Sequence, residues 1–180
     1  MQLRELGRLS YLLSASLVLA AGESTPPSAR EVLATAQAEA ASQHKNIFLM
    51  FHATWCGWCK KLDQFIETGE NKPIIDKYFV VTHLTIQEIG DKVKLNNPGG
   101  IEVRDELGGK SAGLPFYAFL DSSGALIVNS IDPKHEDIGY PSEPSEIDWF
   151  MAMLKKAVPA MTADEAATLE SWLRKNGKKG

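Results

Sequence analysis

Apolar residues along the chain form short continuous runs, and between these runs they recur at helical spacing. The run at residues 47–51 is too short for an independent helix and suits a strand buried on both faces. Residues 79–86 are rich in β-branched side chains and predict a second central strand. The runs at residues 116–120 and 125–128 are joined by a short connection that ends in Gly124, which predicts an antiparallel hairpin.

Capping residues mark where the helical segments begin. Ser28 is the expected N-cap of a first helix that ends near residue 43, and a second helix is expected to start at the Cys56 position. Ser145 is the expected cap of a helix whose apolar face includes Met151. Thr162 pairs with Glu165 three residues later and opens a last helix. Shorter helical turns are expected after Pro73 and at residues 101–107, the latter inside a polar segment, 87–111, that otherwise reads as loops.

The order of these elements predicts the fold class. Strands that alternate with helices imply parallel pairing through crossovers, and the late hairpin adds an antiparallel edge. We therefore expect an α/β protein with a central mixed β-sheet flanked by helices and an extra C-terminal helix. The expected division is a signal peptide at 1–22, a linker and first helix at 23–45, the main domain at 46–158, and a C-terminal helical extension at 159–180.

Composition narrows the class of protein further. The chain has 180 residues, of which 44% are hydrophobic and 23% charged, and its formal net charge is -4. This apolar fraction excludes wholesale disorder, and the mild acidity argues against a nucleic-acid-binding surface. The sequence contains only two cysteines, so the fold depends on its core rather than on a network of disulfides.

The N-terminal residues have the pattern of a secretory signal peptide. Arg4 and Arg8 precede an apolar run of about 11 residues that ends in small side chains, whereas a membrane span needs about 20. The alternative is an amphipathic first helix of the domain. We expect a periplasmic or secreted protein that has no stable membrane insertion after cleavage.

The two cysteines form a Cys-x-x-Cys motif at the expected start of a helix. There the sulfur of Cys56 lies near unpaired backbone N–H groups and the positive end of the helix dipole, which favour a thiolate. We therefore assign Cys56 as the attacking thiolate and Cys59, one turn further on, as the resolving thiol. Trp55 and Trp58 would form an apolar collar around them, and Lys60 would offer a positive charge.

Other uses of the cysteine pair remain as alternatives. A zinc site needs further ligands, but there are no other cysteines and the four histidines are scattered, so we expect no metal and no organic cofactor. A purely structural disulfide is a second alternative, although so short a loop would stabilise the fold weakly. His52 at the end of a strand would either modulate the thiolate or serve as a hydrogen-bonded packing residue, and His83 has the same two readings.

The motif and its setting resemble the thioredoxin-like thiol-disulfide oxidoreductases. Residues 53–60, Ala-Thr-Trp-Cys-Gly-Trp-Cys-Lys, follow a buried strand as in that family, and the exported version is most similar to bacterial thioredoxin-domain proteins of the periplasm. Gly113, Leu114 and Pro115 stand where the family carries a cis-proline loop, before the hairpin. The resemblance extends over residues 46–158.

This resemblance implies a thioredoxin fold with a cis Leu114–Pro115 bond beside the cysteines. The backbone of Leu114 would pair with an extended segment of the substrate. The implied substrate contacts are Trp55, Gly57, Trp58, Leu114 and Pro115, with Lys60 and His52 as modulating residues.

The sequence departs from the family pattern in three places. Many thioredoxins carry an acidic residue six positions before the first cysteine, which helps to take the proton of the resolving thiol, but here that residue is Met50. The dipeptide between the cysteines is Gly57-Trp58, which leaves the redox direction open. Residues 87–111 are longer than in a minimal thioredoxin and would influence the choice of partner.

The expected function is therefore thiol-disulfide exchange with other proteins. The expected partners are cysteine-containing protein substrates and a redox-recycling partner, with the chain acting as a monomer and binding no nucleic acid. The alternative is a thioredoxin-fold binding or chaperone-like module whose disulfide is structural, an alternative that Met50 favours.

Overall fold

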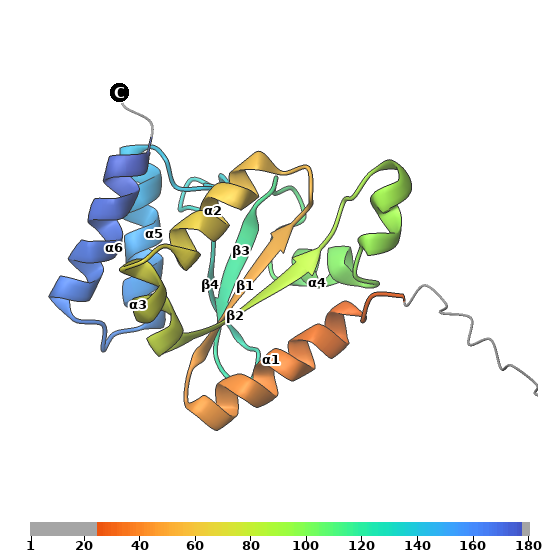
Figure 1. Cartoon of the computed structure of the whole chain (residues 1–180), viewed down its shortest axis with the longest axis horizontal. Helices are drawn as coiled ribbons and strands as arrows, with labels where there is room; N and C mark the ends of the chain where they lie inside the picture. The colour runs from red at the N-terminus through yellow and green to blue at the C-terminus, as the bar shows by residue number, and fades with distance from the viewer. Residues whose placement is uncertain (1–24, 178–180) are drawn as a thin grey trace, which may run out of the picture.

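A mixed four-stranded sheet lies at the centre of the molecule. The computed structural model describes residues 25–177, so the signal peptide expected at residues 1–22 lies outside the described residues. The strands are β1 (Asn46–His52), β2 (Phe79–Thr85), β3 (Phe116–Leu120) and β4 (Leu126–Asn129), in the order β2-β1-β3-β4. Strand β1 pairs in parallel with β2 and antiparallel with β3, and β4 continues the sheet antiparallel to β3 (Figure 1). The mixed sheet predicted from the element order is confirmed.

The prediction that residues 79–86 form a second central strand is wrong. Strand β2 pairs only with β1 and forms an edge of the sheet, whereas β3 occupies the second central position. All five residues of β3 are buried, but Thr82 and His83 of β2 are only partly buried. The β-branched side chains that indicated a strand suit an edge as well as a centre, so composition alone does not separate the two.

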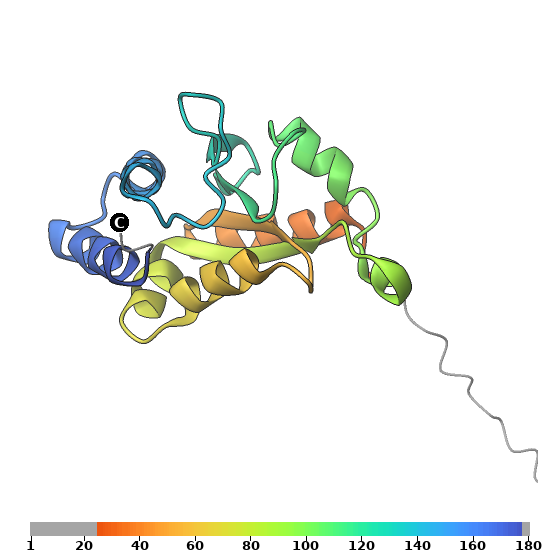
Figure 2. The ribbon, with the colours of Figure 1, turned by 90° about the horizontal axis from the view of Figure 1, so that it is seen from above.

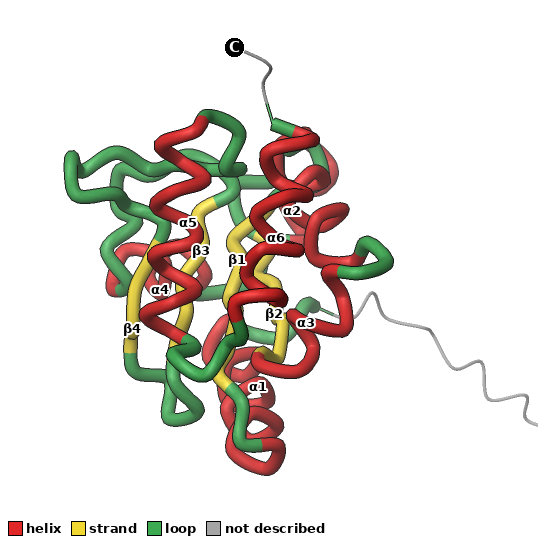
Figure 3. Tube along the Cα trace, turned by 90° about the vertical axis from the view of Figure 1, so that its left-hand side faces the viewer, coloured by secondary structure: helices red, strands yellow, loops and turns green. Residues whose placement is uncertain are grey.

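Helices cover both faces of the sheet. One face is covered by α1 (Ala29–Gln43) and α4 (Gly100–Glu106), and the other by α2 (Gly57–Glu67), α3 (Asn71–Tyr78) and α5 (Pro144–Ala157) (Figure 2). The C-terminal helix α6 (Ala163–Asn176) lies beside α5 (Figure 3). Trp172 of α6 packs on Phe65 of α2. A short 3₁₀ helix, η1 (Gly90–Leu95), connects β2 to α4. Within residues 25–177, none of these helices is long and apolar enough to cross a membrane.

Alternate residues of β1 divide the core into two halves. Phe48 and Met50 point to the face of α2 and α5, whereas Leu49 and Phe51 point to the face of α1. The Phe48 ring lies 4.8 Å from that of Phe119, centroid to centroid. It also contacts the rings of Phe79, at 6.0 Å, and Tyr117, at 5.6 Å. An aromatic cluster therefore fixes the sheet under the helices that carry the site.

The helix caps agree with the sequence at α1 and α6 but differ at α5. Ser28 is the N-cap of α1 as expected and also forms a capping box with Glu31, and Thr162 with Glu165 forms the capping box expected at α6. Helix α5 instead has Glu143 as its N-cap, not Ser145, with Pro144 in the first helical position and the Glu146 side chain accepting the Glu143 N–H at 2.8 Å. Proline at this position is favoured because its fixed φ suits the first turn and its missing N–H would be unpaired there anyway.

The buried face of α5 also differs by one position from the prediction. Met153 is 1% exposed and belongs to the core, whereas Met151 is only partly buried. Ile147, Phe150, Met153, Leu154 and Ala157 are its buried residues. Met151 lies four residues after Ile147 and Met153 three residues after Phe150, so both fit helical spacing and the sequence pattern alone does not separate them.

Candidate active site

The two cysteines lie at the N-terminus of α2 and form a disulfide. Cys56 is the N-cap, and its Sγ accepts the backbone N–H of Cys59 at 3.1 Å. The two Cα atoms are 5.3 Å apart. Cys56 is 3% exposed and Cys59 2% exposed, so only a small part of the pair meets solvent. After reduction, the same N–H and the helix dipole would stabilise negative charge on Cys56.

The loop before β3 lies against the cysteine pair. The Leu114–Pro115 peptide bond is cis, as the family resemblance implies. Leu114 is partly buried and packs against the cluster of Ala53, Cys56 and Cys59. The structure therefore brings together the two elements that the sequence pattern suggested, the motif and the proline loop, which lie about 60 residues apart in the chain.

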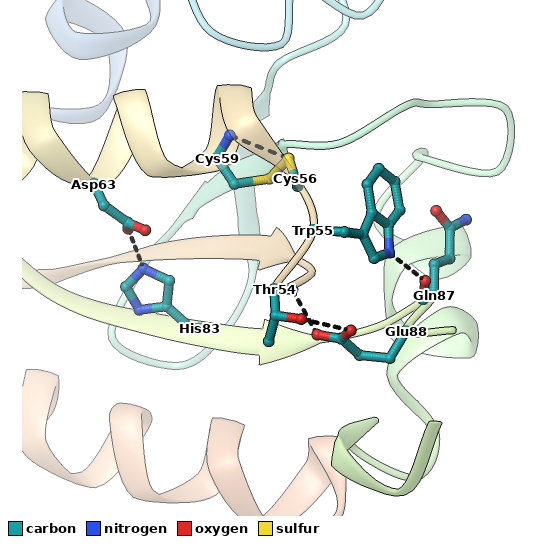
Figure 4. The surroundings of a disulfide bond; sticks show 8 residues. All are labelled: Thr54, Trp55, Cys56, Cys59, Asp63, His83, Gln87 and Glu88. Carbon is teal, nitrogen blue, oxygen red and sulfur yellow. Dashed lines mark hydrogen bonds and ion pairs between the residues drawn. A yellow bond between two sulfur atoms is a disulfide. The ribbon is translucent and has the colours of Figure 1, made fainter. Parts of the chain in front are cut away.

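Trp55, directly before Cys56, and Trp58, between the two cysteines, are held by different partners. Trp55 is 51% exposed, and its Nε1–H donates to the carbonyl oxygen of Gln87 at 2.8 Å (Figure 4). Trp58 is 43% exposed and stacks on Tyr140, with centroids 5.9 Å apart and an interplanar angle of 16°. Both indoles keep an exposed surface beside the disulfide, which fits the apolar collar expected from the sequence.

The ammonium group that lies over the Trp58 ring belongs to Lys61 and not to Lys60, the lysine that the motif suggested. Lys60 is exposed, and Lys61 places its Nζ 4.5 Å from the centroid of the Trp58 ring. The same Nζ lies 5.9 Å from the ring of Tyr140. An ammonium group over two aromatic faces is attracted by their π-systems, so Lys61 helps to hold Trp58 in place. The sequence contained no signal for Tyr140, because it is distant in the chain.

A buried carboxylate ties the segment before Cys56 to the end of β2. Glu88 is 5% exposed, accepts the Thr54 backbone N–H at 2.5 Å through Oε1, and accepts the Thr54 hydroxyl at 2.9 Å through Oε2. Lys92 Nζ donates to the Thr54 Oγ1 at 3.0 Å. Figure 4 shows the Glu88 carboxylate to the right of Thr54. Sequence reasoning missed this contact because its partners are 34 residues apart.

Residues 89–95, here called the arm, protrude at the end of β2. None of the residues of η1 is buried, and Ile89, Val93 and Leu95 are 68%, 52% and 40% exposed. Figures 1 and 2 show the arm, coloured light green, beyond the sheet on the side of the loop that precedes α2. Exposed apolar side chains that gather on one segment are typical of an interaction surface.

Asp137 lies below the proline loop. Its Oδ1 accepts the Ser130 hydroxyl at 2.7 Å and the Gly139 N–H at 3.4 Å, and the backbone of Gly113 also bonds to the carboxylate. Burial raises the pKa of Asp137 to about 6, although these hydrogen bonds act to lower it. The Asp137 side chain thus links the segment after the hairpin to the loop that carries Pro115.

We expect replacing Asp137 with asparagine to stabilise the fold at pH 7. The folded pKa of about 6 exceeds the ordinary 3.8, so the folded state binds the proton more tightly. The stabilisation is full below about pH 3.8 and is lost as the pH rises through about 6. At roughly 1.4 kcal/mol per pKa unit, the Asp137→Asn variant should gain about 3 kcal/mol in the free energy of unfolding at pH 7, measured by urea unfolding.

The pH dependence separates this effect from other changes. The advantage of Asp137→Asn over the wild-type chain should shrink to a small remainder at pH 4, where the carboxyl of the folded state is almost fully protonated. Asp91→Asn, an exposed residue on η1, serves as the control and should leave the free energy of unfolding unchanged. An advantage that is equal at pH 4 and pH 7 would show that the carboxyl is not the cause.

The other candidate residues differ in their burial and contacts. Met50 is 0% exposed among apolar side chains, and no carboxylate stands in its place. Gly57, between the cysteines, has open space around it. His52 and His83 lie in contact under α2, with ring centroids 5.1 Å apart. Among the residues that the structure describes, no group of three His, Cys, Asp or Glu side chains is arranged to hold a metal ion.

Comparison with known proteins gives a family. A sequence model described as thioredoxin-like matches residues 29–122, just over half of the chain. No curated protein matches the chain. Among solved structures, the disulphide isomerase of Xylella fastidiosa Temecula1 is 18% identical, covers 89% of this chain and 98% of its own length, and has a TM-score of 0.48.

Two further solved structures are similar. The DsbH oxidoreductase is 20% identical, with 84% of this chain and 96% of its own covered and a TM-score of 0.45. A thioredoxin from Thermus thermophilus is 15% identical, with 75% of this chain and 91% of its own covered and a TM-score of 0.42.

Proposed function

Because the chain belongs to the thioredoxin-like family, we propose that it exchanges disulfides with cysteine-containing proteins through Cys56 and Cys59. The observation that carries this proposal is the position of Cys56 as the N-cap of α2, with its Sγ accepting the Cys59 N–H at 3.1 Å. This position favours the thiolate, which is the nucleophile in disulfide exchange. The proposal includes no metal or organic cofactor.

The reaction proceeds in two successive thiol-disulfide exchange steps. The Cys56 thiolate attacks one sulfur of a substrate disulfide, the substrate S–S bond breaks, and the other substrate sulfur leaves as a thiolate. The Cys59 thiolate then attacks Cys56 Sγ, which forms the Cys56–Cys59 bond and releases the second substrate sulfur as a thiolate. Two electrons pass from the protein to the substrate, and the reverse sequence oxidises a substrate dithiol.

The substrate is proposed to bind across the two tryptophans and the proline loop. Trp55, Trp58, Gly57, Leu114 and Pro115 are the proposed contacts, and His52 and Lys60 modulate the pair. The exposed indoles beside the disulfide, and the packing of Leu114 on the cysteines, support this arrangement. The apolar arm extends the same side of the molecule and would contribute to partner choice.

The proposed site of action is the periplasm or the exterior of the cell. The N-terminal sequence supports this, because it has the basic start, apolar run and small residues of a signal peptide. The chain would act as a monomer, with a separate redox partner that restores Cys56 and Cys59 after each exchange. Oxidising conditions outside the cytosol are compatible with the disulfide found here.

A redox titration tests the proposal. The protein is equilibrated with reduced and oxidised glutathione at set ratios, and free thiols are counted by alkylation and mass spectrometry. A redox-active pair should be half reduced between about -270 and about -120 mV, the range that thioredoxin and DsbA span. A structural bond should instead resist reduction down to below about -300 mV.

The second candidate function is a binding or chaperone-like module with a structural disulfide. Met50 favours it, because a fully buried apolar side chain leaves no carboxylate to take the proton of the resolving thiol. A half-reduction potential below about -300 mV, together with unchanged partner binding in the reduced protein, would support this module and overturn exchange as the function.

A further inference from the structure

Two imidazoles lie together beneath α2, the helix that begins at the cysteine motif. His52 is the last residue of β1 and His83 belongs to the neighbouring strand β2, and their ring centroids are 5.1 Å apart. Both rings are partly buried. His52 Nε2 also lies 3.1 Å from the hydroxyl oxygen of Thr85, the residue opposite it on β2.

The carboxylate of Asp63 links this pair of rings to α2, the helix that carries Cys59. His83 Nε2 lies 2.9 Å from Asp63 Oδ1. Asp63 follows Cys59 by four residues on α2, a spacing that places the two side chains on the same side of the helix with their Cβ atoms roughly 5–6 Å apart. Figure 4 shows the Asp63 and His83 contact on the same side of α2 as Cys59.

The imidazole pair is positioned where the usual acidic group is missing. Met50 and His52 are two residues apart in β1, so they point to the same face of the sheet, the face of α2. Met50 is apolar and fully buried and does not accept a proton. His52 is closer along the strand to the loop that carries Cys56, and it bears a ring nitrogen that does accept one.

Burial, more than the charged groups around it, keeps the His52 imidazole neutral near pH 7. Burial of the ring is the largest influence and lowers the pKa of His52, and the charge of His83 lowers it further. Asp63 of α2 and Glu88 of the segment after β2 act in the opposite direction. When Nε2–H donates to Thr85 Oγ1, the Nδ1 lone pair is left free to accept a proton.

We propose that the His52 imidazole takes up the proton of Cys59 when Cys59 resolves the mixed disulfide, and that His83 and Asp63 are positioning residues that set its proton affinity. This inference rests on the proposed exchange function. The Cys59 thiol gives its proton to neutral His52 and attacks Cys56 Sγ. The Cys56–substrate bond breaks, and the substrate sulfur leaves as a thiolate. The resulting imidazolium returns its proton to solvent, and the reverse reaction uses the same proton in the opposite direction.

A disulfide reagent that releases a coloured thiolate in two phases tests this step. The fully reduced protein is mixed rapidly with excess 5,5′-dithiobis(2-nitrobenzoate). The first phase is the attack of Cys56 and depends on reagent concentration, and the second is the attack of Cys59 on the mixed disulfide and does not. A missing first phase would count against the exchange function itself, whereas the inference about His52 concerns only the second.

We expect His52→Gln to slow the second phase at pH 7 by about tenfold to hundredfold, because general-base assistance is commonly worth at least that much. Its rate should then rise about tenfold per pH unit, as the fraction of Cys59 thiolate increases, whereas the wild-type rate should be level above about pH 6.5. The first phase should be little changed. His44→Asn, at an exposed histidine that ends α1 on the other face of the sheet, is the matched control and should follow the wild-type profile.

Two further variants leave His52 in place and move its pKa in opposite directions. His83→Gln removes a charge that lowers the pKa, so the pH at which the second phase slows on acidification should move up. Asp63→Asn removes a charge that raises the pKa, so that pH should move down. Simple loss of packing would not shift the profile in opposite directions. A wild-type profile in His52→Gln, or shifts of the same sign in the other two, would overturn the proposal.

Discussion

Replacing Cys59 with alanine should turn the protein into a stable covalent trap, and replacing Cys56 with alanine should abolish exchange altogether. Cys56 lies at the N-terminus of α2 and supplies the thiolate, so its loss removes the nucleophile. Without Cys59, the mixed disulfide forms but no neighbouring sulfur resolves it. Turnover should fall below the limit of detection in both variants, whereas adduct formation should remain only in Cys59→Ala.

The adduct is measured with a disulfide-linked pair of peptides. Mass spectrometry should find one peptide bound to Cys59→Ala, and this mass should disappear on treatment with dithiothreitol. The double variant Cys56→Ala with Cys59→Ala is the control and should bind no peptide. If Cys59→Ala forms no adduct although iodoacetamide alkylates Cys56, then exposure of the thiol is not in question and the exchange function is wrong.

The second large effect concerns the aromatic core rather than the cysteines. Replacing Phe48 with alanine should lower the free energy of unfolding by about 3–5 kcal/mol, because a fully buried ring in contact with Phe79, Tyr117 and Phe119 leaves a cavity. The free energy of unfolding of a folded domain is typically about 5–15 kcal/mol, so this loss would be a large share of the stability of the domain. Urea unfolding, followed by circular dichroism with the disulfide intact in every sample, measures it.

Two comparison variants test whether the loss of stability comes from the cavity in the core. Phe48→Leu keeps most of the buried volume and should cost clearly less than the alanine variant. Trp55→Ala removes a side chain of similar size that is 51% exposed, and it should change the free energy of unfolding by much less than Phe48→Ala. A Phe48→Ala chain within about 1 kcal/mol of the wild type would contradict the role assigned to this cluster.

Local signals in the sequence predicted most of the secondary structure. Residues 116–120 form β3 as predicted, and the capping pairs at Ser28 and Thr162 mark the starts of α1 and α6. These features depend on nearest neighbours in the chain, which a pattern records. The position of the cysteine pair at a helix N-terminus and the cis-proline loop also followed, the first from spacing and the second from family resemblance.

The remaining features depend on contacts between distant segments. The edge position of β2 is decided by which strands pair with it, and its composition does not record this. Glu88 reaches Thr54 across 34 residues and Asp63 reaches His83 across 20. No local pattern marks either pair. A carboxylate or histidine in a sequence gives no indication of its partner, so the electrostatic surroundings of the site appear only with the fold.

The exposed position of the arm bears on how the choice of protein partner can change. Residues 90–95 contribute no buried side chain, and Ile89 is 68% exposed, so substitutions there remove little from the folding free energy. The proposed exchange chemistry lies in α2, whereas the exposed apolar side chains lie on the arm. Under the proposed function, new partner preferences can therefore arise by substitution of Ile89, Val93 and Leu95 while the fold stays as it is, whereas Lys92, which donates to Thr54, links the arm to the segment before Cys56.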